Sequence, residues 1–358
     1  MRRCEIAVAG GGPAGLAAAI SAAIEGCSVT VIEPKEGVID KACGEGLMPG
    51  GVRMLRELGV ASVVGQPLEG IRYGLASNPK VVALGTFEGE GGLGIRRIEL
   101  HRALVARAES VGVRWIHETV TSVEEKADRV CVAGIEARYL VAADGLHSPI
   151  RRMLGLELPP RGPKRFGVRR HYRMQPWSDR VEVWFAGGAE AYVTPVARDL
   201  VGVAFLYEPP GKFDDLLPRF PELMAKLAGQ SPVTKARGAG PFRQRVKARR
   251  KGRVLLAGDA AGYVDPLTGE GVALGMATGA LAATCLARGV PEQYEAQWAK
   301  ATRGYRVLTS ALLAVARRPY LHRGLVTAAK MMPFAFDGVL SMLDVGDAPA
   351  RLVVHCPA

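Results

Sequence analysis

The sequence has few of the features that mark metal, disulfide or membrane proteins. Its six cysteines are scattered without a C-x-x-C pair, so we expect neither a metal site nor a redox dithiol. No apolar run reaches the roughly 18 residues that a membrane-spanning helix needs. The first residues lack the apolar core and cleavage site of a signal peptide, so we expect a cytoplasmic protein.

Repeats, low-complexity tracts and nucleic-acid-binding motifs are also missing, which argues against solenoids and disordered chains. The net charge of +12 suits either a solubilising surface or an anionic partner. The densest basic stretch, Arg243 to Arg253, has no interleaved aromatic residues, so we expect no nucleic-acid partner. A chain of 358 residues that is 48% hydrophobic can form two packed domains.

A Gly-rich turn near the N-terminus has the spacing of a dinucleotide site. An apolar strand over 4–9 leads into G-G-G-P-A-G, an Ala-rich helix and a second strand over 28–32 that ends in an acid. The glycines permit a tight turn and close approach to a pyrophosphate, and the helix offers free N–H groups. The acid can bind a ribose, which favours FAD or NAD over NADP. The residues assigned here are Gly10, Gly12, Pro13, Ala14, Gly15, Glu33 and Pro34.

Two later strands end in aspartate turns. The strand over 139–143 is followed by Asp144 and Gly145, and the strand over 253–257 is followed by Gly258 and Asp259. A strand-end aspartate can accept hydrogen bonds from ribityl hydroxyls. A helix that begins near the following glycines can direct its N–H groups at the flavin N1–C2=O edge. To this turn we assign Pro266, Gly269 and Gly271, which permit close approach to a flat ring.

Together these three motifs resemble those of the p-hydroxybenzoate-hydroxylase-type FAD-dependent oxidoreductase superfamily. That superfamily includes class A flavoprotein monooxygenases, halogenase-like enzymes and geranylgeranyl-reductase-like enzymes. The resemblance covers roughly residues 1 to 290 and implies that Arg97 lies near the FAD phosphates. No second G-x-G-x-x-G occurs, so NAD(P)H is expected as a transient electron donor.

The expected fold class is α/β, with a discontinuous Rossmann-type FAD-binding domain, an antiparallel-sheet substrate domain and a C-terminal helical cap. Alternation over 181–185 places Val181 and Val183 on one face of a strand and Glu182 on the other. The predicted boundaries are 1–75, 92–164 and 245–290 for the FAD-binding domain, 76–91 and 165–244 for the substrate domain, and 291–358 for the helical region. The helical region, with three stretches ending near Asp344, suits a cap, a dimer face or a peripheral membrane contact.

Two segments bear on the subfamily. Residues 41–49, K-A-C-G-E-G-L-M-P, are similar both to a C-G-G-G-L stretch of geranylgeranyl-reductase-like enzymes and to a G-E-x-x-x-P stretch of halogenases. This similarity implies that Cys43 and Gly44 lie near the flavin. Residues 190–195 lack both tryptophans of the halogenase W-x-W-x-I-P pattern, which argues against halogenation. Tyr192 and Pro195 stand at spacings close to the Y-x-W-x-F-P pattern of prenyl reductases, but the Trp and Phe of that pattern are absent, which weakens the reductase interpretation. Cys43 and Tyr192 are the candidate catalytic residues. Cys43 also suits plain packing, and His171 suits either a proton donor or a structural residue.

Three functions stay open. The first is an NAD(P)H-dependent monooxygenase that acts through a flavin C4a-hydroperoxide on an apolar or aromatic small molecule of biosynthetic origin. The second is a geranylgeranyl-reductase-like enzyme that reduces C=C bonds of an isoprenoid or lipid-like substrate. The third is a non-catalytic FAD-binding protein. In the first two the cofactor does the chemistry, so no side-chain nucleophile is required. The substrate could be free, CoA-bound or carried by a carrier protein, and the oligomeric state is left open.

Overall fold

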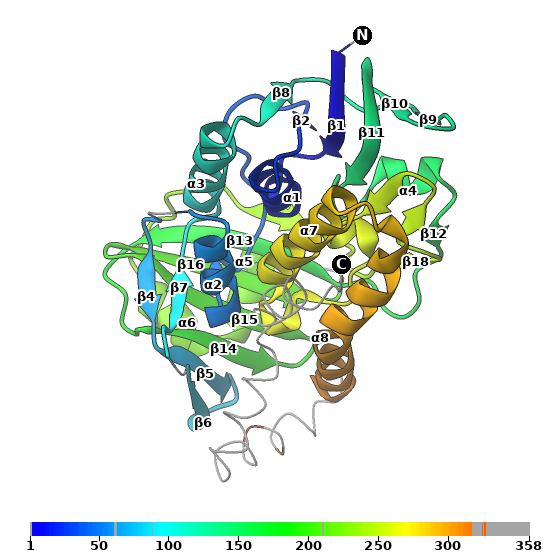
Figure 1. Ribbon diagram of the computed structural model, residues 1–358. Coiled ribbons are helices and arrows are strands. Elements are labelled where there is room, and N and C mark those ends of the chain that lie inside the picture. Colours follow the sequence, from blue (N-terminus) through cyan, green and yellow to red (C-terminus); the bar gives the residue numbers. More distant parts are fainter. Residues whose placement is uncertain are drawn as a thin grey trace.

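The computed structural model describes residues 2–60, 63–87, 89–209, 211–316, 324 and 326. A mostly parallel sheet forms the first layer (Figure 1). Its parallel strands run in the order β20-β11-β1-β2-β8, an arrangement that brings segments far apart in sequence to one edge. These strands are β20 (Val254–Leu256), β11 (Ile135–Ala142), β1 (Arg2–Ala9), β2 (Val29–Ile32) and β8 (Arg114–Ile116). The short strands β9 (Val123–Glu125), β10 (Val130–Val132) and β19 (Arg250–Lys251) pair antiparallel at its margins.

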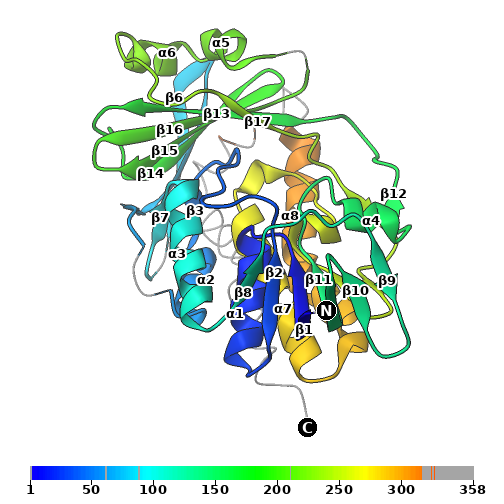
Figure 2. The same ribbon diagram turned by 90° about the horizontal axis from the view of Figure 1, so that it is seen from above.

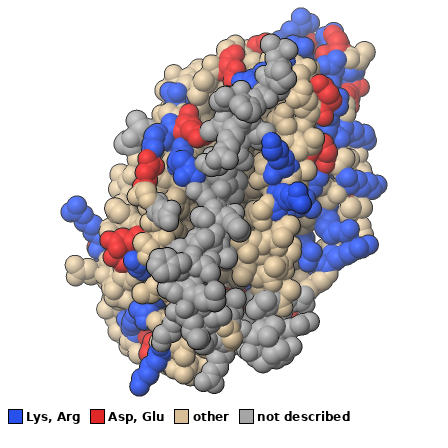
Figure 3. All heavy atoms as spheres, turned by 60° about the horizontal axis from the view of Figure 1, so that its bottom comes forward, with Lys and Arg blue, Asp and Glu red and all other residues tan. Residues whose placement is uncertain are grey.

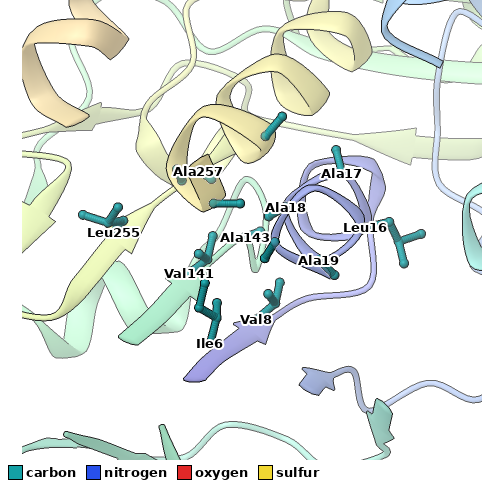
Figure 4. Packing of buried hydrophobic residues seen from close by; sticks show 14 of the residues in the cluster. Ile6, Val8, Leu16, Ala17, Ala18, Ala19, Val141, Ala143, Leu255 and Ala257 are labelled. Atoms are coloured by element: carbon teal, nitrogen blue, oxygen red, sulfur yellow. The ribbon is translucent and has the colours of Figure 1, made fainter. Parts of the chain in front are cut away.

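Two helices of small residues cover one face of this sheet. Helix α1 (Pro13–Ile24) packs against α7 (Gly271–Ala287), and a Cβ at Gly279 would overlap the Ala14 carbonyl oxygen. Glycine is therefore required for the close approach of the two helices. One buried apolar cluster, part of which is drawn in Figure 4, includes Leu16 and the alanines of α1 together with Val8, Val141 and Leu255 of three neighbouring strands. The predicted Gly-rich turn is thus held by a continuous apolar core.

A second, seven-stranded sheet forms the other layer (Figure 2). Its neighbours pair antiparallel as predicted, except that β14 and β5 are parallel. Strand β5 begins at Gly70, so the chain enters this sheet before the predicted boundary at residue 76, because β5 pairs with β14 rather than with the first sheet. The strands in order are β17 (Arg237–Ala239), β13 (Phe166–Arg173), β16 (Leu200–Tyr207), β15 (Ala189–Ala197), β14 (Arg180–Ala186), β5 (Gly70–Leu75) and β6 (Asn78–Thr86).

Short elements connect and cover the two sheets. Helices α5 (Phe213–Leu216) and α6 (Pro221–Leu227) lie over the outer face of the second sheet (Figure 2). Between the layers, β3 (Gly46–Leu47), β7 (Gly92–Gly94) and β4 (Gln66–Leu68) form a small sheet. Further elements are α2 (Pro49–Glu57), α3 (Arg97–Ser110), α4 (Pro149–Met153), and the paired strands β12 (Glu157–Leu158) and β18 (Arg245–Val246).

Helix α8 (Tyr294–Ala316) is the described part of the predicted C-terminal helical region. Its Tyr305 hydroxyl donates a hydrogen bond of 2.9 Å to the Asp265 carbonyl, so α8 contacts the turn before α7. The apolar and basic stretches predicted between 317 and 344 lie outside the described residues, apart from residues 324 and 326. In the described part of the chain, no helix combines the length and hydrophobicity needed to cross a bilayer.

Basic side chains gather along one edge of the face shown in Figure 3. Within the basic stretch from Arg243 to Arg253, several cations are already used by the fold. Arg249 pairs with Glu295 at 2.6 Å, Lys251 donates to the Leu154 carbonyl, and Arg253 donates to the Ala127 carbonyl. These contacts support a structural role for much of that stretch.

Candidate active site

A cavity of about 870 Å³ lies between the two sheets, at the carboxyl ends of β1, β11 and β20. Ligands bind at this edge in open α/β sheets. The cavity continues to the inner face of the second sheet, so one space joins the predicted cofactor motifs to the predicted substrate wall. The predicted residues in its wall are Gly12, Pro13, Ala14, Cys43, Gly44, Arg97, Asp144, Gly145, Tyr192, Gly258, Asp259, Pro266, Gly269 and Gly271.

The glycines of the N-terminal turn serve different purposes. Gly10 has a φ of 106°, and a Cβ there would overlap the Ala143 carbonyl oxygen, so glycine is required at this contact between two strand ends. Gly15 meets the Gly10 carbonyl in the same way. At Gly12, by contrast, no heavy atom of the described residues lies within 4 Å of the site of a Cβ. Gly12 is the N-cap of α1 and offers no side-chain cap, so the first N–H groups face open space in the cavity.

Arg97 also indicates that the cavity binds an anion. Its side chain is buried at the start of α3, and its Nη1 has no hydrogen-bond partner among the described residues. A buried guanidinium nitrogen without an acceptor is costly, and a phosphate oxygen would satisfy it. The uncapped N-terminus of α1 and the Arg97 Nη1 that lacks an acceptor therefore fit the pyrophosphate of FAD.

The predicted acids differ in their surroundings. Asp259 lies in the cavity wall, where burial raises the pKa of its carboxyl group. Asp144 instead accepts hydrogen bonds from Ser148 Oγ at 2.6 Å and from the Ile150 N–H at 3.0 Å, which fixes the start of α4. Glu33 is partly exposed and is not among the residues that line the cavity, and its carboxylate accepts the Gly11 N–H at 2.8 Å. Asp259 is therefore the strand-end acid best placed for ribityl hydroxyls.

The predicted flavin turn connects to the second sheet through Tyr192. The Tyr192 hydroxyl donates a 2.8 Å hydrogen bond to the Leu267 carbonyl, and burial raises the pKa of this phenol well above its usual range. Gly269 has a φ of 74° in this turn, which favours glycine. Helix α7 begins at Gly271, so its free N–H groups face the cavity as the sequence predicts.

The far side of the cavity is mainly apolar. Alternation along β14 turns Val181 and Val183 inward, while Glu182 and Trp184 pair on the outer face through a 3.1 Å hydrogen bond. Two tyrosines, Tyr73 and Tyr263, also lie in this wall. The remaining apolar members of the wall include Ile71, Leu206 and Phe242. This side of the cavity suits an apolar or aromatic molecule.

Cys43 lies in the cavity wall, beside a residue that sequence reasoning did not single out. The Cys43 sulfur accepts the Glu45 N–H at 3.3 Å, and burial raises the pKa of the thiol, so the reactive thiolate form is disfavoured. Glu45 itself lies in the wall and is buried. The sequence did contain one signal for Glu45, because it is a charged residue between two glycines in a stretch of small residues. His171 lies behind the wall, 2.5 Å from Glu45.

Comparisons with known proteins agree with this geometry. Residues 3–297 match the family described as FAD binding domain. Digeranylgeranylglycerophospholipid reductase 1 of Methanothermobacter thermautotrophicus is 30% identical over 312 residues, which are 80% of this chain and 78% of that protein. Menaquinone reductase of Mycobacterium tuberculosis is 30% identical over 310 residues, 79% of this chain and 76% of that one. The solved structure of p-nitrophenol 4-monooxygenase PnpA from Pseudomonas putida has a TM-score of 0.80 at 19% identity and covers 97% of this chain and 99% of its own.

Proposed function

Since this chain belongs to the FAD binding domain family and is an FAD-dependent oxidoreductase, we propose that it oxygenates a small apolar or aromatic molecule of biosynthetic origin. One observation carries the proposal: a continuous cavity joins the FAD-type residues around Gly12 to the apolar wall around Val183. A substrate on that wall and a cofactor at the strand ends would share a water-poor space.

The residues at the strand ends would hold the cofactor. The N-terminus of α1 and Arg97 would bind the pyrophosphate, Asp259 would bind ribityl hydroxyls, and the N-terminus of α7 would face the flavin ring. When bound, FAD supplies the redox chemistry by accepting two electrons from NAD(P)H and passing them to O₂. The balanced reaction consumes the substrate (R–H), NAD(P)H, O₂ and one proton, and it forms the hydroxylated product (R–OH), water and NAD(P)⁺.

The second sheet would orient the substrate and exclude water. Its apolar side chains favour a hydrocarbon or aromatic ring, and the Tyr73 and Tyr263 hydroxyls offer polar contacts for a ring substituent. Tyr192 keeps its proton, because its pKa is raised, and it links this wall to the flavin turn. We assign Tyr192 an orienting role.

Reduction of a C=C bond in an isoprenoid or lipid-like substrate is the second candidate. Two observations favour it: Cys43 lies in the cavity wall, and the two relatives that are 30% identical are reductases by name. In this reaction the substrate gains two hydrogens and no oxygen. Either reaction uses the same apolar wall, so the two candidates differ in the fate of the electron pair.

The donor and partners complete the proposal. NAD(P)H would visit transiently, since the sequence offers one dinucleotide turn. The substrate would be free or held by CoA or a carrier protein, which the net charge of +12 would attract, and the C-terminal region could add a peripheral membrane contact. We place the protein in the cytoplasm, in keeping with the free cysteines of the described part of the chain.

Isotope labelling separates the two reactions. FAD-loaded protein is incubated with NADPH or NADH and a panel of alkylphenols and polyprenyl compounds, under ¹⁸O₂ and under argon. An oxygenase places ¹⁸O in the product and is inactive under argon, whereas a reductase adds two hydrogens in both atmospheres. A protein that accepts electrons from neither nucleotide would contradict the proposed donor, and the same panel reduced with dithionite under argon would then test the reductase alone.

A further inference from the structure

Glu45 has an unusual backbone conformation at the edge of the cavity. Its φ is 60°, in the left-handed region that non-glycine residues rarely adopt, although glycines flank it on both sides. Its side chain is 1% exposed, so a carboxylate is buried in a strained segment. Such a conformation persists when surrounding contacts enforce it, and it occurs often in ligand clamps.

The Glu45 carboxylate bridges two elements that lie far apart in the sequence. Oε1 accepts the backbone N–H of Arg97 at 2.8 Å, at the start of α3. Oε2 lies 2.5 Å from Nε2 of His171, on β13 of the second sheet. A Cβ at Gly202 would approach Oε2 to 3.4 Å, so glycine on the neighbouring strand leaves room for this contact. The carboxylate therefore connects the loop that carries Glu45 both to Arg97, the candidate phosphate-binding residue, and to the second sheet.

His171 is held as firmly as Glu45. Its Nδ1 lies 2.9 Å from Thr234 Oγ1 and 3.2 Å from Arg169 Nη1, and its side chain is fully buried. The cations that face the pair are Arg96, with Nε 3.6 Å from Glu45, and Arg169, with Nη2 3.7 Å from Glu45. Both guanidinium groups lie close enough to attract the Glu45 carboxylate.

The loop that Glu45 anchors presents its backbone to the cavity. Residues 40–46 all lie in the cavity wall. Thr194 donates a 2.8 Å hydrogen bond to the Gly44 carbonyl, and Ile95 N donates one of 2.8 Å to the Glu45 carbonyl. The Glu45 N–H reaches the Cys43 sulfur. The carboxylate contacts and these backbone contacts together fix the path of the loop opposite the N-terminus of α1.

We propose that Glu45 and His171 are positioning residues that hold the loop 40–46 and the Arg97 backbone in the arrangement that binds FAD. Glu45 supplies the bridging carboxylate, and His171 fixes it to the second sheet. The pair thereby sets the separation of the two layers at the cofactor. This inference rests on the FAD-dependent function proposed above, but it concerns the binding of the cofactor rather than turnover.

The test compares Glu45→Gly, Glu45→Gln and His171→Gln with the wild type. Glycine adopts a positive φ without strain, so Glu45→Gly removes the carboxylate while keeping the loop conformation accessible. Glu45→Gln keeps the shape and loses the charge. The matched control is Glu99→Gln on the first turn of α3, where Glu99 pairs at the surface with Arg102. The readouts are the FAD dissociation constant by fluorescence titration, the visible spectrum of bound FAD, and the melting temperature of the FAD-free protein.

We expect Glu45→Gly to raise the FAD dissociation constant about tenfold or more, the two glutamine variants to raise it less, and the control to stay within about twofold. The spectrum of bound FAD should shift in the three test variants alone. Unchanged affinity and spectrum would overturn the inference, as would a lower melting temperature with unchanged affinity, because the pair would then be purely structural. If the Glu45 variants do not fold, His171→Gln decides by the same criteria. These readouts need no substrate, so they stand apart from the isotope test.

Discussion

Substituting Gly12 with alanine should separate cofactor binding from folding. The φ of Gly12 is −75°, which alanine adopts freely, and the site of the new methyl group has no described neighbour within 4 Å. The FAD-free protein should therefore lose no more than about 1 kcal/mol of unfolding free energy, the ordinary difference between glycine and alanine at a helix N-cap. In the loaded protein the methyl group would occupy the space expected for the pyrophosphate. Overpacking of this kind costs about 1–3 kcal/mol, which corresponds to a roughly 5- to 150-fold weaker FAD affinity.

Gly10 provides the opposite case within the same turn. Alanine there would combine a φ of 106° with overlap of the Ala143 carbonyl, so the FAD-free protein itself should lose several kcal/mol, roughly 2–6. Urea unfolding of FAD-free Gly12→Ala and Gly10→Ala, together with fluorescence titration of Gly12→Ala with FAD, measures both effects. If Gly12→Ala bound FAD as tightly as the wild type, the N-terminus of α1 would not be the pyrophosphate site. If Gly12→Ala unfolded as readily as Gly10→Ala, the inference that the space beside Gly12 is open would be wrong.

Two further substitutions test other parts of the site, and a third tests Glu190, a buried acid on β15 that does not line the cavity. Arg97→Gln should weaken FAD binding about tenfold or more, because it removes the buried guanidinium whose Nη1 has no acceptor among the described residues; equal affinity by titration would remove Arg97 from the site. Val183→Phe should fill the apolar side of the cavity and raise the substrate KM while the FAD dissociation constant stays constant; a parallel loss of FAD would contradict the division of the cavity. Burial raises the pKa of Glu190 to about 7, so the folded state holds its proton between the unfolded pKa of 4.5 and that value. Stability from this group is fully present below 4.5 and is lost as pH rises through 7. The pH dependence of urea unfolding should be weaker in Glu190→Gln, and an identical dependence would refute the assignment.

Local motifs were predictable from the sequence because their function depends on short spacings. The turn at Gly10, the start of α7 at Gly271 and the inward face of β14 all follow from glycine placement or from alternation along a strand. The predictions of an α/β class and of the FAD-dependent oxidoreductase family were based on these local motifs, and both are confirmed.

Contacts between distant segments were not predictable in this way. Glu45 and His171 are 126 positions apart, and neither belongs to a motif that names the other. Asp144 follows its strand as predicted, but hydrogen bonds to Ser148 and Ile150 occupy its carboxylate, which depends on the path of the chain after the turn. The pairing of β5 with β14 likewise depends on tertiary packing, which short-range patterns do not encode.

The strand order of the first sheet has a consequence for biosynthesis. Strand β1 lies between β2 and β11, and β20, more than half the chain away, completes the row before α7 can pack on α1. A chain is synthesised from its N-terminus, so β1 has no partner strand on one side until β11 has been synthesised, and the row is completed only with β20. The nucleotide pocket can close only after about 287 residues have been synthesised, and shorter fragments would expose apolar strand surface to chaperones or aggregation.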